Sequence, residues 1–116
     1  MNAGKHDTVV DLDHLAQYTF GDGALEAELF DLFLTNGKRY LASLTGAADL
    51  AAWREAAHAL KGSARGIGAV AVARLSADAE ALETAPSETE KARIIADLDA
   101  ALTQVEAFVA ARSAVT

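Results

Sequence analysis

The sequence predicts an all-α protein, an antiparallel up-and-down four-helix bundle with a short additional N-terminal helix. Alanine supplies much of the 52% hydrophobic content, and this composition favours close-packed helices over a sheet rich in β-branched and aromatic residues. Apolar residues recur at spacings of three and four in four long stretches. Short segments with glycine or proline separate these stretches, so consecutive helices are expected to lie antiparallel.

The first two helices are expected at about 11–20 and 24–44. Leu12, Leu15 and Tyr18 are expected to give the first helix an inward side, and Asp22, after Gly21, can cap the second. The second helix has a seam of apolar residues that is wider than one core face requires: Leu29, Phe30, Phe33, Leu34, Tyr40, Leu41 and Leu44. Core packing is favoured for each of Phe30, Leu32 and Phe33, but some could contact the first helix or be exposed for a partner.

A third helix is expected from Asp49, its N-cap, to the Gly66-Ile67-Gly68 turn. A fourth helix follows and ends at Thr84-Ala85-Pro86, after which Ser87 and Glu90 form a capping box for the last helix. Fraying is expected from Arg112 onward. The residues expected to face inward on the third helix are Leu50, Trp53, Ala57, Leu60, Ala64 and Ile67. On the fourth helix they are Val72, Leu75, Ala79 and Leu82, and on the last helix Ile94 or Ile95, Leu98, Leu102, Val105 and Val109.

His58 points away from the inward stripe of the third helix, by roughly 130° on a helical wheel. Arg54, Lys61 and Arg65 share its side of the helix, and Gly62 lies one turn on. A glycine inside a helix costs about 1 kcal/mol relative to alanine, and here it leaves room for a bulky partner to approach the ring. Lys61 and Arg65 can donate to phosphoryl oxygens, and neutral imidazole, with a pKa near 6.5, is a competent nucleophile.

The run Ala57–Ala64, followed by Ile67-Gly68-Ala69 and Leu82-Glu83, resembles the signature of histidine-containing phosphotransfer (HPt) domains. The likeness extends to Asp11-Leu12 with Leu15, to Gly21-Asp22 and to Leu29–Leu34, so it covers nearly the whole chain. One departure is Ala59, where many members carry threonine. Apolar seams alone fit any small bundle, and the resemblance supplies the specific topology.

The resemblance implies that His58 is the phospho-acceptor, with Lys61 offsetting charge on the phosphoryl oxygens and Gly62 admitting the partner. Arg54, Ser63 and Arg65 are expected to form the surrounding phosphate and partner surface. The implied partners are receiver domains of response regulators or a hybrid sensor histidine kinase, and the receiver brings Mg²⁺. The sequence lacks a phosphate-binding glycine loop and a kinase signature, so we expect a phosphotransfer intermediate without kinase or ATPase activity and without a cofactor of its own.

The sequence suggests two other functions. Glu55-Ala56-Ala57-His58 spells the Glu-x-x-His of di-iron bundles, but that site needs a second copy and inward ligands, and neither condition is met. The alternative that stays open is a non-catalytic binding module that docks a receiver or kinase domain while the histidine is incidental. His6 and His14 are interpreted as surface or structural residues.

The formal charge of −7 disfavours binding to nucleic acid or anionic membranes. Cysteine is absent, which excludes disulfides and thiolate metal sites. Residues 1–8 are expected to be a flexible tail rather than a signal peptide, followed by a single domain at 9–113. No apolar run reaches the roughly 18 residues of a membrane span, so a cytoplasmic monomer is expected.

Overall fold

The computed structural model describes residues 9–115, and within them all regular secondary structure is helical apart from one isolated β-bridge. The all-helical prediction is therefore confirmed, while the predicted tail at 1–8 lies outside the described residues. The helices are α2 (Leu12–Thr19), α3 (Gly23–Thr45), α4 (Leu50–Ile67), α5 (Val70–Glu80) and α6 (Glu88–Val115).

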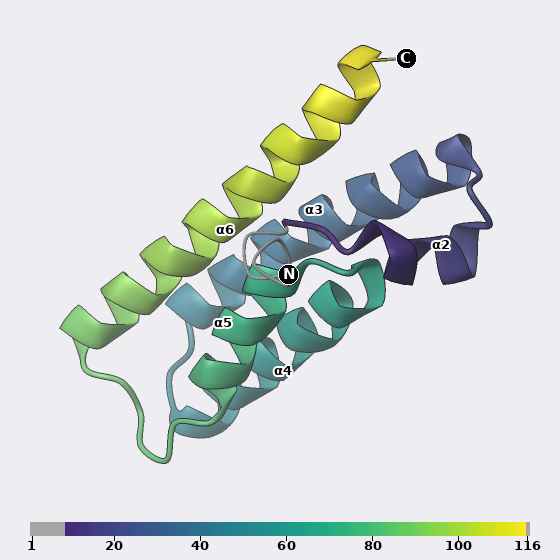
Figure 1. Ribbon diagram of the computed structural model, residues 1–116. Coiled ribbons are helices and arrows are strands. Elements are labelled where there is room, and N and C mark those ends of the chain that lie inside the picture. Colours follow the sequence, from purple (N-terminus) through teal and green to yellow (C-terminus); the bar gives the residue numbers. More distant parts are fainter. Residues whose placement is uncertain (1–8, 116) are drawn as a thin grey trace, which may run out of the picture.

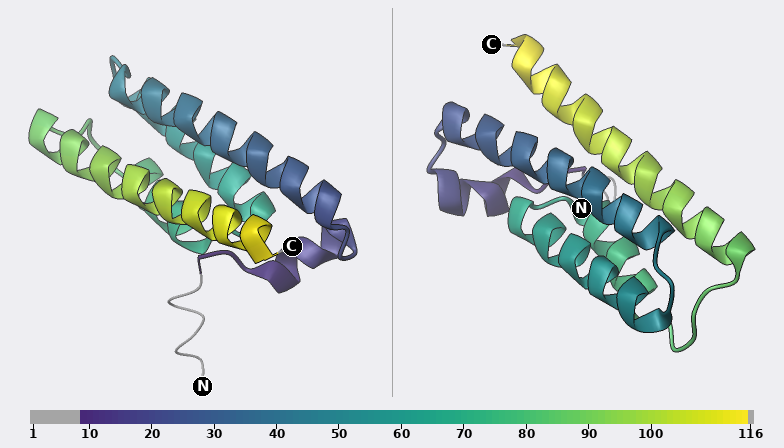
Figure 2. Two further views of the ribbon diagram at one scale, coloured as in Figure 1. Left: turned by 90° about the horizontal axis from the view of Figure 1, so that it is seen from above. Right: turned by 180° about the vertical axis from the view of Figure 1, so that it is seen from behind.

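The helices α3, α4, α5 and α6 run in alternating directions (Figure 1). Helix α3 packs against α4 and α6, and α5 packs against the same two neighbours from the other side. Helix α2 contacts α3 and α4 and lies at the end of the molecule where α3 begins and α4 ends (Figure 2). This arrangement leaves one long side of α4 facing outward.

The helix starts form as the local sequence predicts. Asp22 accepts hydrogen bonds from the amides of Ala24 and Leu25, and Asp49 accepts one from Ala52 at 2.8 Å. Ser87 and Glu90 make the reciprocal pair of a capping box, with distances of 3.2 and 3.1 Å. These contacts satisfy amides that a helix cannot pair internally, which is why the short polar residues before each apolar run mark the starts.

The core is centred on α4. Trp53, Ala57, Leu60, Ala64 and Ile67 are buried there, and they pack with buried side chains of the other helices that include Phe30, Phe33, Leu44, Val72, Leu98 and Val105. The indole Nε1–H of Trp53 donates to the carbonyl oxygen of Ala79 at 2.9 Å. Because this bond joins α4 to the last turn of α5, it fixes the register between these two helices.

The segment before α2 is tied to the turn between α4 and α5. The amide of Asp11 donates to the carbonyl of Gly68 at 2.7 Å, and Val10 forms an isolated bridge with Ala69. Gly68 has a φ of +80°, and a Cβ at this position would lie 2.8 Å from the Asp11 carbonyl oxygen. Only glycine fits this crossing without a shift of the backbone.

One expectation about the last helices needs correction. The fourth predicted helix is not long: α5 ends at Glu80, and a connection at 81–87 replaces the short link, with Leu82 half-buried in it. Helix α6 extends past Arg112 to Val115. Arg112 donates to Glu26 of α3 and lies over the Phe108 ring, and these contacts hold the last turns of α6 against α3.

Candidate functional site

His58 stands on the outward side of α4, with 69% of its side chain exposed. The helix is fixed in rotation by its buried residues, since Ala57 and Leu60 on either side of His58 are fully enclosed. This agrees with the outward direction that the helical wheel predicts. The backbone that carries the ring is therefore rigid while the ring itself is open to a partner.

Glu80, the last residue of α5, contacts the His58 ring. Its Oε2 lies 2.7 Å from Nδ1 of His58. The sequence analysis did not identify Glu80, although a signal was present: His58 lies eleven residues before Ala69 and Glu80 eleven residues after it. In a helical hairpin that turns at Gly68-Ala69, residues at equal distances from the turn come to the same level of the two helices.

Lys61 pairs with the other oxygen of the same carboxyl group, because its ammonium forms an ion pair with Oε1 of Glu80. Its side chain is only 18% exposed. The sequence predicts that the Lys61 ammonium contacts phosphoryl oxygens, whereas in the structure it pairs with Glu80. This hydrogen bond from Lys61, assisted by that from His58, keeps the pKa of the Glu80 carboxyl below its usual range although partial burial acts in the opposite direction.

An ionised carboxylate only accepts hydrogen bonds, so Nδ1 of His58 carries the ring proton in this contact. The lone pair then resides on Nε2, the nitrogen without a partner among the described residues. When the imidazole is neutral, the contact with Glu80 thus leaves the nucleophilic nitrogen Nε2 free and holds Nδ1 in place.

The remaining predicted residues are not all brought to the ring. Gly62 is exposed, and a methyl group built there would have open space around it. Arg54 is turned away, since its Nε donates to the carbonyl of Leu82 at 3.0 Å. Arg65 is exposed in the last turn of α4, whereas Ser63 is half-buried on a different side of the helix. The structure thus gathers His58 and Lys61 around Glu80, leaves Gly62 open, and separates Ser63 from them.

A family comparison supports the resemblance found in the sequence. The family model for the Hpt domain matches residues 28–108, from the first turns of α3 to the last part of α6. The chain belongs to the Hpt domain family. No curated protein and no solved structure shows significant similarity to it. Hpt domains act in histidine phosphotransfer within phosphorelays, where they interact with receiver domains and kinases.

Beside the outward face of α4, this Hpt domain has an apolar hollow of about 420 Å³. Its lining comes from three helices: Tyr18 of α2, Leu29, Leu32, Phe33 and Asn36 of α3, and Ser63, Gly66 and Ile67 of α4. Phe30 and Phe33 are buried, but Leu32 is 58% exposed. Tyr18 is 56% exposed, so the inward position predicted for it is wrong. The sequence does not decide between core packing and exposure for Phe30, Leu32 and Phe33. In the structure, Leu32 is the one of these three that is available to a partner.

Two further properties follow for the described part of this Hpt domain. Among residues 9–115, no three histidine, aspartate or glutamate side chains come together as a metal site would require. None of the helices there has the length and apolar character needed to span a bilayer.

Proposed function

We propose that this Hpt domain is a phosphotransfer protein of a two-component phosphorelay. It accepts a phosphoryl group on His58 from an aspartyl-phosphate receiver domain or a kinase and passes the group to a response regulator. The observation that supports the proposal best is the contact of Nδ1 with Glu80 at 2.7 Å, because it leaves the Nε2 lone pair of an exposed ring as the nucleophile.

The transfer step needs few groups from this chain. The Nε2 lone pair attacks phosphorus, the bond between phosphorus and the aspartyl oxygen breaks, and its electron pair leaves with the carboxylate. Lys61, next to the ring, offsets charge on the phosphoryl oxygens as they approach. We propose that the receiver supplies Mg²⁺ from its own acidic pocket and that this domain has no kinase or ATPase activity of its own.

The partner is proposed to approach over Gly62, where no side chain obstructs the ring. The neighbouring apolar hollow, with exposed Leu32 and Tyr18 at its rim, gives the partner a surface to bury. Arg65 extends the same side of α4 with positive charge. The proposal thus includes a receiver or sensor kinase as partner and a cytoplasmic, monomeric protein with the up-and-down bundle topology of the family, in which α2 is the additional helix.

The test is phosphoryl transfer from labelled phospho-receiver domains of the same cell to the full chain. Label is expected on wild-type protein, on His6→Gln and on His14→Gln, but not on His58→Gln. The melting temperature of His58→Gln should stay nearly unchanged because the side chain is exposed. The phosphorylated product should be labile in acid and stable in alkali, as phosphoramidates are.

Label on His6 or His14 would remove His58 from the mechanism. Binding of receivers to wild-type and His58→Gln protein with equal affinity, without any transfer to either, would instead establish the non-catalytic binding module.

A further inference from the structure

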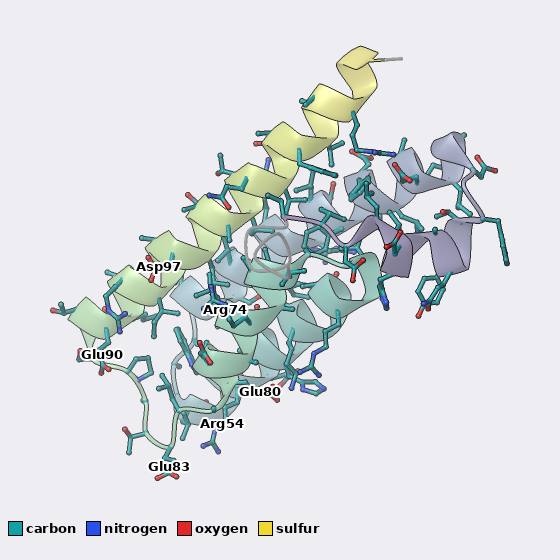
Figure 3. The ribbon with its side chains drawn as sticks, in the orientation of Figure 1. Arg54, Arg74, Glu80, Glu83, Glu90 and Asp97 are labelled. Atoms are coloured by element: carbon teal, nitrogen blue, oxygen red, sulfur yellow. The ribbon has the colours of Figure 1, made fainter. Side chains whose placement is uncertain are left out.

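The two flanks of the outward face of α4 differ in chemistry. The flank toward α5 is charged: Lys61 and Glu80 form an ion pair, and Figure 3 shows Glu80 and Arg54 at the end of α5. The flank toward α3 and α2 is the apolar hollow of about 420 Å³. A partner that approaches His58 from this second flank therefore meets mainly apolar atoms.

Two polar side chains nevertheless line the apolar hollow. Asn36 comes from α3 and Ser63 from α4, and both are half-buried. Within residues 9–115, neither makes a side-chain hydrogen bond, whereas the hydroxyls of Ser43, Thr45 and Thr103 each donate to the carbonyl four residues before them. The Asn36 amide and the Ser63 hydroxyl thus keep their hydrogen-bonding capacity for water or for a partner.

The apolar hollow continues to the acceptor ring without an obstacle. At about 100° per residue, Gly62 lies roughly 40° around α4 from His58, Gly66 roughly 80° and Ser63 roughly 140°. A Cβ built at either glycine would have no described atom within 4 Å. A standard protein interface buries about 800 Å² on each partner, far more than one exposed side chain offers. A receiver docked at His58 therefore passes over both glycines and covers the apolar hollow as well.

A partner that covers the apolar hollow removes water from its two polar groups. If the partner brings only apolar atoms, the amide and the hydroxyl lose their hydrogen bonds to water and gain none, which costs free energy. If it brings an apolar side chain with a hydrogen-bonding group beside it, the apolar walls and the polar groups are both satisfied. Sites that form hydrogen bonds discriminate between ligands much more strongly than purely apolar pockets do.

We propose, building on the proposed function, that Asn36 and Ser63 are specificity-determining residues for the receiver. They select a receiver that inserts an apolar side chain flanked by a hydrogen-bonding group, and they reject one whose inserted surface is entirely apolar. Both act on binding rather than on the transfer step, because Ser63 lies on another side of α4 from the ring and Asn36 belongs to α3.

The experiment measures selection among the receiver domains of the same cell. The variants are Asn36→Leu, which keeps the size and removes the hydrogen-bonding groups, Ser63→Ala, and the double variant. Thr35→Leu and Ser43→Ala are the matched controls, since both residues are exposed on α3 and do not line the apolar hollow. Transfer from each labelled phospho-receiver gives kcat and KM, and titration with each unphosphorylated receiver gives Kd. Phosphoramidate loading checks that His58 reacts normally in every variant.

For the receiver with the highest kcat/KM on wild-type protein, each single substitution should raise KM about three- to tenfold, the usual effect of one lost hydrogen bond. The kcat and the phosphoramidate loading should not change. Receivers that transfer poorly to wild type should lose nothing or improve with the double variant, since no polar group is then left unpaired. The ratio of kcat/KM between preferred and poor receivers should fall at least about tenfold in the double variant and stay unchanged in both controls.

Equal losses for all receivers, with an unchanged ratio, would give Asn36 and Ser63 a structural role and overturn the inference. A double variant with the KM of wild type for every receiver would overturn it as well. Failure of the proposed function is a separate result: wild-type protein that phosphoramidate loads but that no receiver phosphorylates. The Kd values then decide the inference, since their ratio between receivers should still fall in the double variant, and an unchanged ratio would contradict it.

Discussion

The two sides of α4 carry adjacent residues with opposite tasks. On the inward side, Trp53, Ala57 and Leu60 are nearly or fully buried and determine where the helix lies. On the outward side, His58 is 69% exposed and Gly62 has open space around it. Ala57 and His58 are neighbours in the chain, yet one is enclosed by the core and the other faces solvent.

This difference shows how a small bundle can expose a histidine side chain at little cost in folding stability. The core fixes α4 to its neighbours through apolar packing and through the bond from Trp53 to Ala79. The outward side adds polar contacts, such as the exposed one between His58 and Glu80. Since exposed ion pairs contribute little to stability, changes on this side should alter transfer much more than folding.

The largest expected effect is at Gly62, where a larger side chain should lower phosphoryl transfer while it raises folding stability. In Gly62→Leu, the new Cβ has no described atom within 4 Å, and the side chain should obstruct the approach to His58, so transfer efficiency should fall at least about a hundredfold, or roughly 2.7 kcal/mol. Stability should rise by up to about 1 kcal/mol, because leucine is a better helix former. Transfer kinetics with a phospho-receiver, together with thermal unfolding, measure both quantities.

Two variants serve as controls for this prediction. Gly62→Ala should keep most of the transfer rate and gain similar stability. Leu60→Ala, on the inward side, should lose about 2–5 kcal/mol of stability, with transfer by the folded fraction unchanged. Full transfer by Gly62→Leu would show that the partner docks on another surface.

The helices and the direction of His58 could be predicted from the sequence because both depend on local signals. Asp22, Asp49 and the pair Ser87 and Glu90 mark helix starts through contacts within three residues. Spacing along α4 alone separates its inward side from its outward side. The predicted end of the fourth helix was wrong because Leu82 continues the apolar spacing, although the backbone leaves the helix after Glu80.

Glu80 was missed because its role arises from a contact between two helices. Its neighbours in the chain give no sign of function. Its distance from the turn at Gly68-Ala69, equal to that of His58, is the one sequence signal, and the register that Trp53 sets between α4 and α5 brings it to the ring. The same limit applies to Arg54, whose position on the helix suggests the phosphate surface but whose guanidinium is held by the Leu82 carbonyl. Spacing predicts the side of a helix, and tertiary contacts decide which side chains on that side are available.

The second effect, at Lys61, distinguishes a role in the transfer step from a role in binding the receiver. Lys61→Ala should slow transfer at saturating receiver by about tenfold to a hundredfold, or roughly 1.4 to 2.7 kcal/mol, because one charge-assisted contact to the phosphoryl group is lost. Receiver affinity should change little. Rapid-quench transfer rates and equilibrium binding measure the two quantities, and a normal saturated rate would exclude Lys61 from the mechanism.

The smallest effect concerns the two arginines on the same side of α4. Arg65 is exposed in the last turn, whereas Arg54 donates to the Leu82 carbonyl and keeps its charge near the connection after α5. If both attract an acidic partner from a distance, Arg54→Ala and Arg65→Ala should each lower the association rate by about two- to fivefold at low salt. The saturated transfer rate should not change, because neither side chain contacts the His58 ring.

Salt provides the decisive control for the arginines. Screening acts over about 10 Å at 0.1 M ionic strength, so the difference between variant and wild type should disappear as salt rises to 0.5 M. Arg74→Ala is the matched variant, since Arg74 is exposed on α5 and lies roughly 120° around that helix from Glu80. Stopped-flow association with a receiver, measured at both salt concentrations, should leave Arg74→Ala close to wild type. A deficit of Arg65→Ala that persists at high salt would place this guanidinium in direct contact with the partner, and the outward side of α4 would then act through short-range contacts along its whole length.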